Sequence, residues 1–350
     1  MLEKRSRVVE RIDRRLTIED NHTLEEIPSE ELITKIVIEM AKEKSPGLDG
    51  VLVEILRTGW EFMREDFLLM VQGLWDKKRL IGKDRKGIIK LIPKNNMKHL
   101  LKNWRPITLL TMTYKIIATV IAIRPKEMLP RLIDTQQTGF VAGLNIIDNI
   151  LSLRLGQEWM QATEQDTNFV KLDFMKAYDR VAHGFLWETL TTMGMGEASM
   201  ARIKELVEGG CSEVHINGAF TEEIRIGRGV RQGCPLAPQL FAMTTQPLMR
   251  ALREEERLEN LQGLNIGGDW TLLHQLFADD MGICITAVER IAVPKEDGGL
   301  GWTRFRDMAD SLNVRQLSRI LEGARNCRVD PVGQEFHFEN AKEGFLPESV

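Results

Sequence analysis

The alternation of apolar and polar positions along the chain predicts a mixture of helices and strands. Apolar residues recur at helical spacing over 32–40, 60–75, 113–123, 146–155 and 236–252. Short apolar runs bounded by turn residues predict strands at 87–94, 169–173, 214–216, 219–220, 224–226, 272–277 and 283–286. A further amphipathic helix is predicted over 1–15. Asn217-Gly218 is among the strongest local signals for a two-residue hairpin turn.

Acidic residues stand at the ends of two of these strands. Asp173 falls where a strand ends and a helix begins, so its carboxylate can face a cleft instead of the core. Asp279 and Asp280 lie in a predicted hairpin tip formed by residues 278–282. Each acid alone is more often a cap or a solvated turn residue. Three acids brought together would need a divalent cation, and oxygen ligands favour Mg²⁺ or Mn²⁺ over zinc, as in two-metal phosphoryl transfer.

Composition describes an ordinary globular protein. The chain has 350 residues, 43% hydrophobic and 28% charged, enough for one large domain or two. Its longest apolar or near-apolar run, 116–123, is too short to span a membrane, and the charged amino terminus predicts no secretion. The four cysteines lie far apart, which argues against a zinc site or a disulfide framework and fits a reducing compartment.

Positive charge is concentrated in one part of the sequence. Residues 77–131 contain fifteen Lys or Arg and two acids, although the whole chain has a net charge of −4. Such segregation predicts a surface that attracts a polyphosphate, while the acidic remainder holds the metal ligands. The alternative is a basic face that is merely solvated.

Two further stretches could contact nucleotides. Lys94 and Arg105 follow one another on neighbouring extended segments and can clamp a triphosphate, although alone they would indicate a surface hairpin. Residues 227–236 contain three glycines and two arginines before a helix. This loop can lie against a base pair or a phosphate, or it is a plain strand-to-helix connection. The loop 44–50 can approach a nucleic-acid backbone, but a simple turn is the favoured interpretation.

In their order and spacing, these motifs resemble the reverse transcriptases of non-LTR (LINE-type) retrotransposons, most closely the plant lineages. The resemblance extends over about 16–286. Residues 44–50 resemble the KAPGPDG loop, 91–94 and 103–107 the first fingers motifs, 137–149 the segment before the palm, 171–181 the first palm motif, 229–238 the RQGxPLSP motif, and 277–280 the [FY]-A-D-D box.

The resemblance implies a polymerase with a defined set of site residues. By position, Asp173, Asp279 and Asp280 would be the catalytic carboxylates and would hold two Mg²⁺ ions, or Mn²⁺ in their place. The partners would be an RNA template, a DNA primer and dNTPs, with no membrane and a nuclear or cytoplasmic location. Tyr178 would exclude a ribose 2′-OH. Lys94 and Arg105 would steady the triphosphate, and Gln232 and Gly233 would position the template and the new base pair.

The implied fold is α+β, with right-hand fingers and a palm whose antiparallel sheet packs on helices. The expected division is an N-terminal helical extension (1–28), a fingers-like region (29–165), a palm (166–290) and a C-terminal remnant of a downstream retroelement segment (291–350). Residues 294–301 resemble a segment that lies well downstream in the family, so the thumb is expected to be missing, as is the amino-terminal endonuclease of intact elements.

Smaller departures from the family pattern accompany that gap. Leu144 replaces an Arg and Ala237 a Ser, and Pro125 is expected to end or kink its helix. An alternative function is therefore a catalytically inactive remnant that at most binds RNA or DNA. A maturase or an RNA-templated RNA polymerase shares the palm chemistry, but Tyr178 argues against ribonucleotides. His215 and His274 have no ligand-like spacing and are expected to be ordinary sheet residues.

Overall fold

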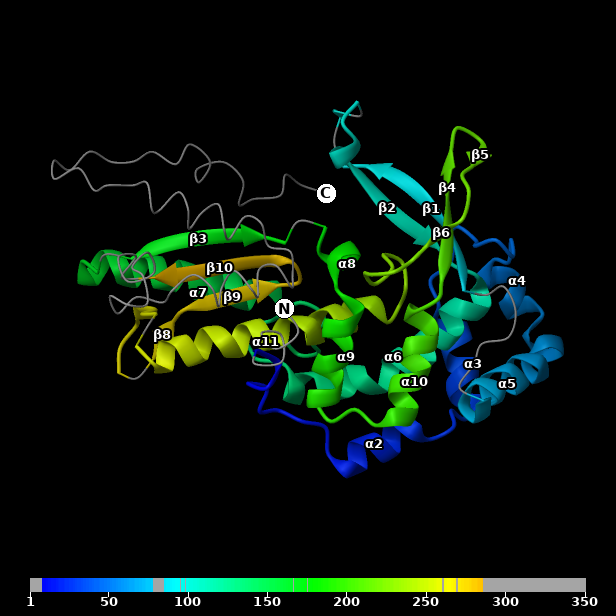
Figure 1. Ribbon diagram of the computed structural model, residues 1–350, viewed down its shortest axis with the longest axis horizontal. Coiled ribbons are helices and arrows are strands. Elements are labelled where there is room, and N and C mark those ends of the chain that lie inside the picture. Colours follow the sequence, from blue (N-terminus) through cyan, green and yellow to red (C-terminus); the bar gives the residue numbers. More distant parts are fainter. Residues whose placement is uncertain are drawn as a thin grey trace.

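The computed structural model describes residues 8–77, 85–94, 96–97, 99–165, 167–174, 176–259, 261–268 and 270–285. For residues 77, 102, 168–170 and 173 the description covers the backbone only. Figure 1 shows the two larger sheets of the described fold side by side, with most of the helices below them. The predicted remnant at 291–350 lies outside the described residues.

Helices form the base of the described fold, and their ends follow local capping. The Thr17 hydroxyl accepts from the Asp20 N–H, and the Asp20 carboxylate accepts from the Thr17 N–H. This capping box starts helix α2 (Ile18–Glu25). The described helices are α2 (Ile18–Glu25), α3 (Glu30–Glu39), α4 (Val53–Thr58), α5 (Trp60–Lys77), α6 (Met112–Leu132), α7 (Ile146–Thr163), α8 (Ala177–Arg180), α9 (His183–Thr192), α10 (Glu197–Val207) and α11 (Ala237–Arg257), with a 3₁₀ turn η1 (Leu101–Asn103).

One sheet joins strands that are distant in sequence. Its strands are β1 (Lys86–Pro93), β2 (Trp104–Leu109), β4 (Cys211–Ile216), β5 (Ala219–Phe220) and β6 (Ile224–Arg225). β2 and β1 form an antiparallel hairpin, and β1 pairs with β4 in parallel. Asn217 and Gly218 both have positive φ, as the predicted hairpin turn between β4 and β5 requires. The predicted boundary between fingers and palm lies at residue 166. This sheet contains strands from both sides of it, because β1 and β2 precede residue 166 and β4, β5 and β6 follow it.

The second sheet is antiparallel, in the order β3-β10-β9, and lies beside α11 in Figure 1. It consists of β3 (Asn168–Asp173), β9 (His274–Phe277) and β10 (Asp280–Ile285), and a separate small hairpin pairs β7 (Leu264–Asn265) with β8 (Thr271–Leu272). The strand predicted over 272–277 is therefore divided between β8 and β9. The predicted tip 278–282 is also shorter, because β10 already begins at Asp280.

Two helix predictions were wrong in part, because the helix predicted over 1–15 does not extend over 12–15 and α6 does not end at Pro125. The described part of the predicted helix 1–15 is not helical over 12–17, because the capping box at Thr17 starts a new helix after it. The helix α6 continues through Pro125 and Pro130. A proline removes a backbone donor, but α6 buries apolar side chains on both sides of Pro125, including Val120 and Leu129. That burial offsets the lost hydrogen bond.

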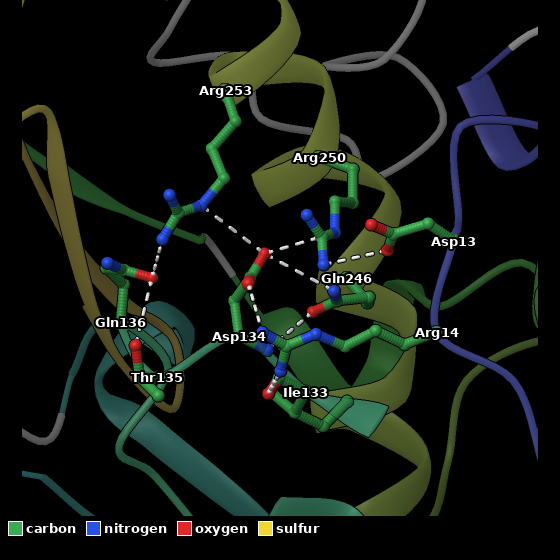
Figure 2. A network of polar contacts seen from close by, with 9 residues as sticks. All are labelled: Asp13, Arg14, Ile133, Asp134, Thr135, Gln136, Gln246, Arg250 and Arg253. Carbon is green, nitrogen blue, oxygen red and sulfur yellow. Dashed lines mark hydrogen bonds and ion pairs between the residues drawn. The ribbon is translucent and has the colours of Figure 1, made fainter. Parts of the chain in front are cut away.

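A buried ionic network connects the amino-terminal segment before α2 to helix α11 (Figure 2). Asp134, after α6, is almost completely buried. Its carboxylate lies 3.3 Å from Arg14, 3.4 Å from Arg250 and 3.6 Å from Arg253, and it accepts from the Gln246 side-chain amide at 3.3 Å. The network therefore connects residues before α2, the end of α6 and helix α11.

The exposed face of α7 and the buried His274 complete the description. The apolar face predicted for α7 exists, but Ile147, Leu151 and Leu155 on it are exposed within the described residues. His274, in β9, is buried, and burial lowers its pKa to about 3 with a further contribution from the Arg253 charge. It therefore stays neutral inside the sheet. No helix among the described residues is long and apolar enough to cross a bilayer.

Candidate active site

The strand register brings together the acids that the sequence singled out. In the antiparallel pairing of β3 with β10, Asp173 lies directly opposite Asp280. Directly opposed residues of such a pair have Cα atoms about 4.5–5.5 Å apart. The Phe174 N–H donates to the Asp279 carbonyl oxygen at 3.2 Å, so the turn that carries Asp279 adjoins the end of β3. Acids from two distant parts of the chain therefore meet at one end of the sheet.

The described carboxylates at this end are accessible and suit a cation. One Asp280 oxygen lies 3.6 Å from the Lys171 ammonium, and both side chains are more than half exposed. Carboxylate oxygens are the donors that Mg²⁺ and Mn²⁺ prefer, and Lys171 shows that Asp280 already attracts a positive charge. Among the described side chains, which do not include that of Asp173, no group of three His, Cys, Asp or Glu is placed to hold a metal ion. The three-carboxylate ligand set therefore stays a prediction.

The aromatic ring of Tyr178 lies near Asp279 and is held by two other aromatic rings. Its ring stacks on Phe241 of α11, with centroids 5.1 Å apart, and meets Phe140 edge-on at 6.5 Å. Burial raises the pKa of the Tyr178 hydroxyl far above its usual range, and the Asp279 charge raises this pKa further. The hydroxyl is therefore neutral, and the ring is held in place from two sides next to a site carboxylate.

The glycine-rich loop before α11 is held between two elements of the site. The Val230 N–H donates to the Tyr178 carbonyl at 2.8 Å, and the Thr108 N–H of β2 donates to the Gln232 carbonyl at 2.8 Å. Gly233 has a φ of +108°, and a Cβ there would lie 2.4 Å from the Thr108 carbonyl oxygen. Only glycine fits this contact, which fixes Gln232 and Gly233 between α8 and β2.

Lys94 and Arg105 lie exposed at the end of the β1–β2 hairpin, as predicted. The Lys94 N–H donates to the Asn103 carbonyl at 2.7 Å, and Arg105 lies opposite Ile92. Burial raises the pKa of the Asp179 carboxyl, whereas the charge of Lys94, among others, lowers it. Lys94 therefore acts electrostatically on the segment that carries Tyr178.

Part of the positive charge predicted for 77–131 is neutralised by acids elsewhere. Arg85 pairs with Glu205 at 3.4 Å, and Lys86 contacts both Glu213 and Glu223 at 2.7 Å. The segment's later arginines also pair, Arg124 with Glu26 and Arg131 with Asp20. The charge count therefore overstates the basic surface that these residues present.

One residue of the site was missed from the sequence. Gln137, for which the sequence predicts no role beyond the segment 137–149, is completely buried, and its side-chain amide contacts the turn between β9 and β10. A glutamine next to Thr138 and Gly139 in a connecting segment is typical of many loops. The resemblance marks the segment 137–149 as a whole, and the local sequence does not distinguish Gln137 within it.

Comparison with known proteins now identifies the class to which this fold and site belong. A family model described as reverse transcriptase (RNA-dependent DNA polymerase) matches residues 92–295. The chain belongs to the reverse transcriptase family.

Its relatives include proteins of the non-LTR retrotransposons TX1 and R2. It is 34% identical over 243 residues to the "Transposon TX1 uncharacterized 149 kDa protein" of Xenopus laevis. The aligned region covers 69% of this chain and 18% of that protein. It is 27% identical over 237 residues to a Pol polyprotein of the type-1 retrotransposable element R2 of Popillia japonica, covering 66% and 32%. The chain thus spans less than a third of these relatives.

Among solved structures, telomerase of Candida tropicalis in complex with a fragment of telomeric RNA matches with a TM-score of 0.39 and 13% identity. The match covers 67% of this chain and 40% of that one. A likeness this loose does not define the fold.

Proposed function

We propose that this chain is an RNA-directed DNA polymerase of a non-LTR retroelement, of a plant-like lineage, that transfers dNMP from a dNTP to a primer 3′-OH on an RNA template. The observation that supports the proposal most is the register that sets Asp173 opposite Asp280, with Asp279 in the adjoining turn. Family membership supplies the reaction class, and this juxtaposition supplies a place for it.

In the proposed mechanism, Asp173, Asp279 and Asp280 would hold two Mg²⁺ ions. When bound, such ions lower the pKa of an attacking hydroxyl and stabilise charge on a transferring phosphoryl group. Lys171 lies 3.6 Å from Asp280 and would have to give up this contact when the carboxylate takes a cation. The carboxylates thus provide negative charge where the cations are needed, at an exposed sheet end that a primer can reach.

The substrate would lie between the sheet end and the β1–β2 hairpin. Lys94 and Arg105 would bind the triphosphate, Lys94 as a point charge and Arg105 with its bidentate fork. Tyr178, fixed by Phe241 and Phe140, would contact the sugar and exclude a 2′-OH. Gln232 and Gly233 would support the new base pair. Under this proposal, 29–165 act as fingers and 166–290 as palm, although the β1–β4 pairing connects them.

Primer extension on an RNA template with Mg²⁺ and dNTPs tests the proposal. We expect the wild-type chain to extend the primer and Asp279→Asn to lose about a thousandfold in rate, because several kcal/mol of charge stabilisation depend on that carboxylate. The matched control is Glu65→Gln, which removes an exposed acid on α5 and should leave the rate unchanged.

If wild type and Asp279→Asn make equally little product, the polymerase proposal is wrong for this chain. Salt-sensitive retention of RNA by both proteins would then support the alternative, an inactive remnant that binds nucleic acid through cations such as Lys94 and Arg105.

A further inference from the structure

The turn that carries Asp279 is conformationally unusual. β9 and β10 are joined by two residues, Ala278 and Asp279, because Phe277 pairs with Asp280. Ala278 has a φ of +55°, a region that glycine normally occupies in such turns. It is also 7% exposed, so water cannot readily satisfy its backbone groups. Something else must stabilise this conformation.

The side-chain amide of Gln137 binds both backbone groups of Ala278. Its Oε1 accepts from the Ala278 N–H at 3.0 Å, and its Nε2 donates to the Ala278 carbonyl at 3.3 Å. The same amide accepts from the Gly139 N–H at 3.0 Å and donates to Thr245 of α11 at 3.3 Å. Gln137 is 0% exposed, and in these four contacts its Oε1 accepts two hydrogen bonds and its Nε2 donates two. The turn is therefore connected to the buried helix behind it.

The surrounding loop leaves the turn little freedom. A Cβ on Gly139 would lie 2.3 Å from the Ala278 nitrogen, so the loop backbone is in direct contact with the turn. The strand leading to the turn is held by other groups, the backbone of Gln136 and Thr138 and the side chain of Asn149. Leu276 donates to the Gln136 carbonyl at 2.7 Å, and its own carbonyl accepts from the Asn149 side chain at 2.6 Å. Asn149 thus anchors the strand, whereas Gln137 anchors the turn.

We propose that Gln137 is a positioning residue that sets the orientation of Asp279 by holding Ala278 in its left-handed conformation. The inference rests on the proposed function. Because Ala278 directly precedes Asp279, rotation of the peptide between them would move the carboxylate away from the Asp173–Asp280 pair. A side chain with two hydrogen bonds to one residue can prevent that rotation, and a bond to the strand alone cannot.

The first test compares Gln137→Met with Asn149→Leu. Both substitutions remove a buried amide that binds the same hairpin and keep a similar volume, but only Gln137→Met releases the turn. The affinity of the free protein for Mn²⁺ can be measured by electron paramagnetic resonance of the unbound ion. In Gln137→Met we expect this affinity to fall by about 10- to 100-fold, as for loss of a group that orients metal ligands. Asn149→Leu should bind Mn²⁺ within about threefold of wild type.

Primer extension by the same proteins supplies a second measurement. In Gln137→Met the kcat should fall by about 10- to 100-fold, while the KM for dNTP stays close to wild type because Lys94, Arg105 and Tyr178 are untouched. Equal losses of Mn²⁺ binding in the Gln137 and Asn149 variants would overturn the inference, because they would indicate a general weakening of the hairpin.

Rescue by a second substitution separates positioning from folding. Glycine adopts positive φ without strain, so Ala278→Gly should restore part of the Mn²⁺ affinity in the Gln137→Met background. Absence of any rescue in a folded double variant would contradict the proposal. Wild-type Mn²⁺ binding without primer extension would instead count against the proposed polymerase function and leave the Gln137 inference standing.

Discussion

Single residues at the site differ in how far the sequence could predict them. Asp173, Asp279 and Asp280 were located because strand composition and turn residues surround them, and the structure places their backbones together. Gln137 was missed because its partner Ala278 is 141 residues away, and nothing next to a buried amide reveals a contact of that separation. The catalytic roles of all these side chains stay predictions.

At Tyr178 the proposed sugar discrimination has a direct test. Replacing it with Ala removes the ring that Phe241 and Phe140 hold beside Asp279, and the space left would accept a 2′-OH. We expect the preference for dNTP over NTP, measured as the ratio of kcat/KM values, to fall by about 10- to 100-fold, the range for a contact of about 1–3 kcal/mol. An unchanged ratio in Tyr178→Ala would show that another group selects the sugar.

Elements defined by local signals were predicted well, and those defined by distant contacts were not. The Asn217-Gly218 hairpin and the β1–β2 pair follow from turn and strand residues close in sequence. The parallel pairing of β1 with β4 does not, because parallel strands need a long crossover and their register depends on tertiary packing. Burial likewise overrode the local effect of Pro125 in α6.

The contact between the glycine-rich loop and β2 can be tested with a pair of glycine substitutions. Gly233→Ala should destabilise the protein by about 2–3 kcal/mol, because its Cβ would lie 2.4 Å from a backbone oxygen and its φ is positive. Gly73→Ala in α5 meets nothing within 4 Å and should stabilise by about 0.5–1 kcal/mol. Urea unfolding measures both, and a neutral Gly233→Ala would mean that the loop is not packed on β2.

Across the whole molecule, the Asp134 network joins segments that no short-range pattern connects (Figure 2). The sequence indicated an amphipathic amino terminus but not its attachment, which needs Arg14, Arg250 and Arg253 around one buried carboxylate. From the sequence alone, each of these charged residues would be predicted to lie on the surface. Only the assembled fold shows that the segment before α2 is part of the body that supports the site.

Breaking this network should release the amino-terminal segment. Asp134→Asn leaves three guanidinium groups around a neutral side chain, and we expect a loss of about 3 kcal/mol, because one charge of a buried ionic cluster is removed. Asp13→Asn removes a more exposed partner of Arg250, 2.7 Å from it, and should cost no more than about 1 kcal/mol. Chemical denaturation measures both values, and equal losses would show that Asp134 is not the centre of the network.

The pairing of β3 with β10 also has a consequence for biosynthesis. β3 finds this partner only after about a hundred further residues have been translated, which takes roughly 5–20 seconds at ribosomal speed. During that interval the nascent strand has an open edge that any extended neighbour can occupy. The end of the sheet that carries the acids must thus be shielded on the ribosome until β10 has been translated.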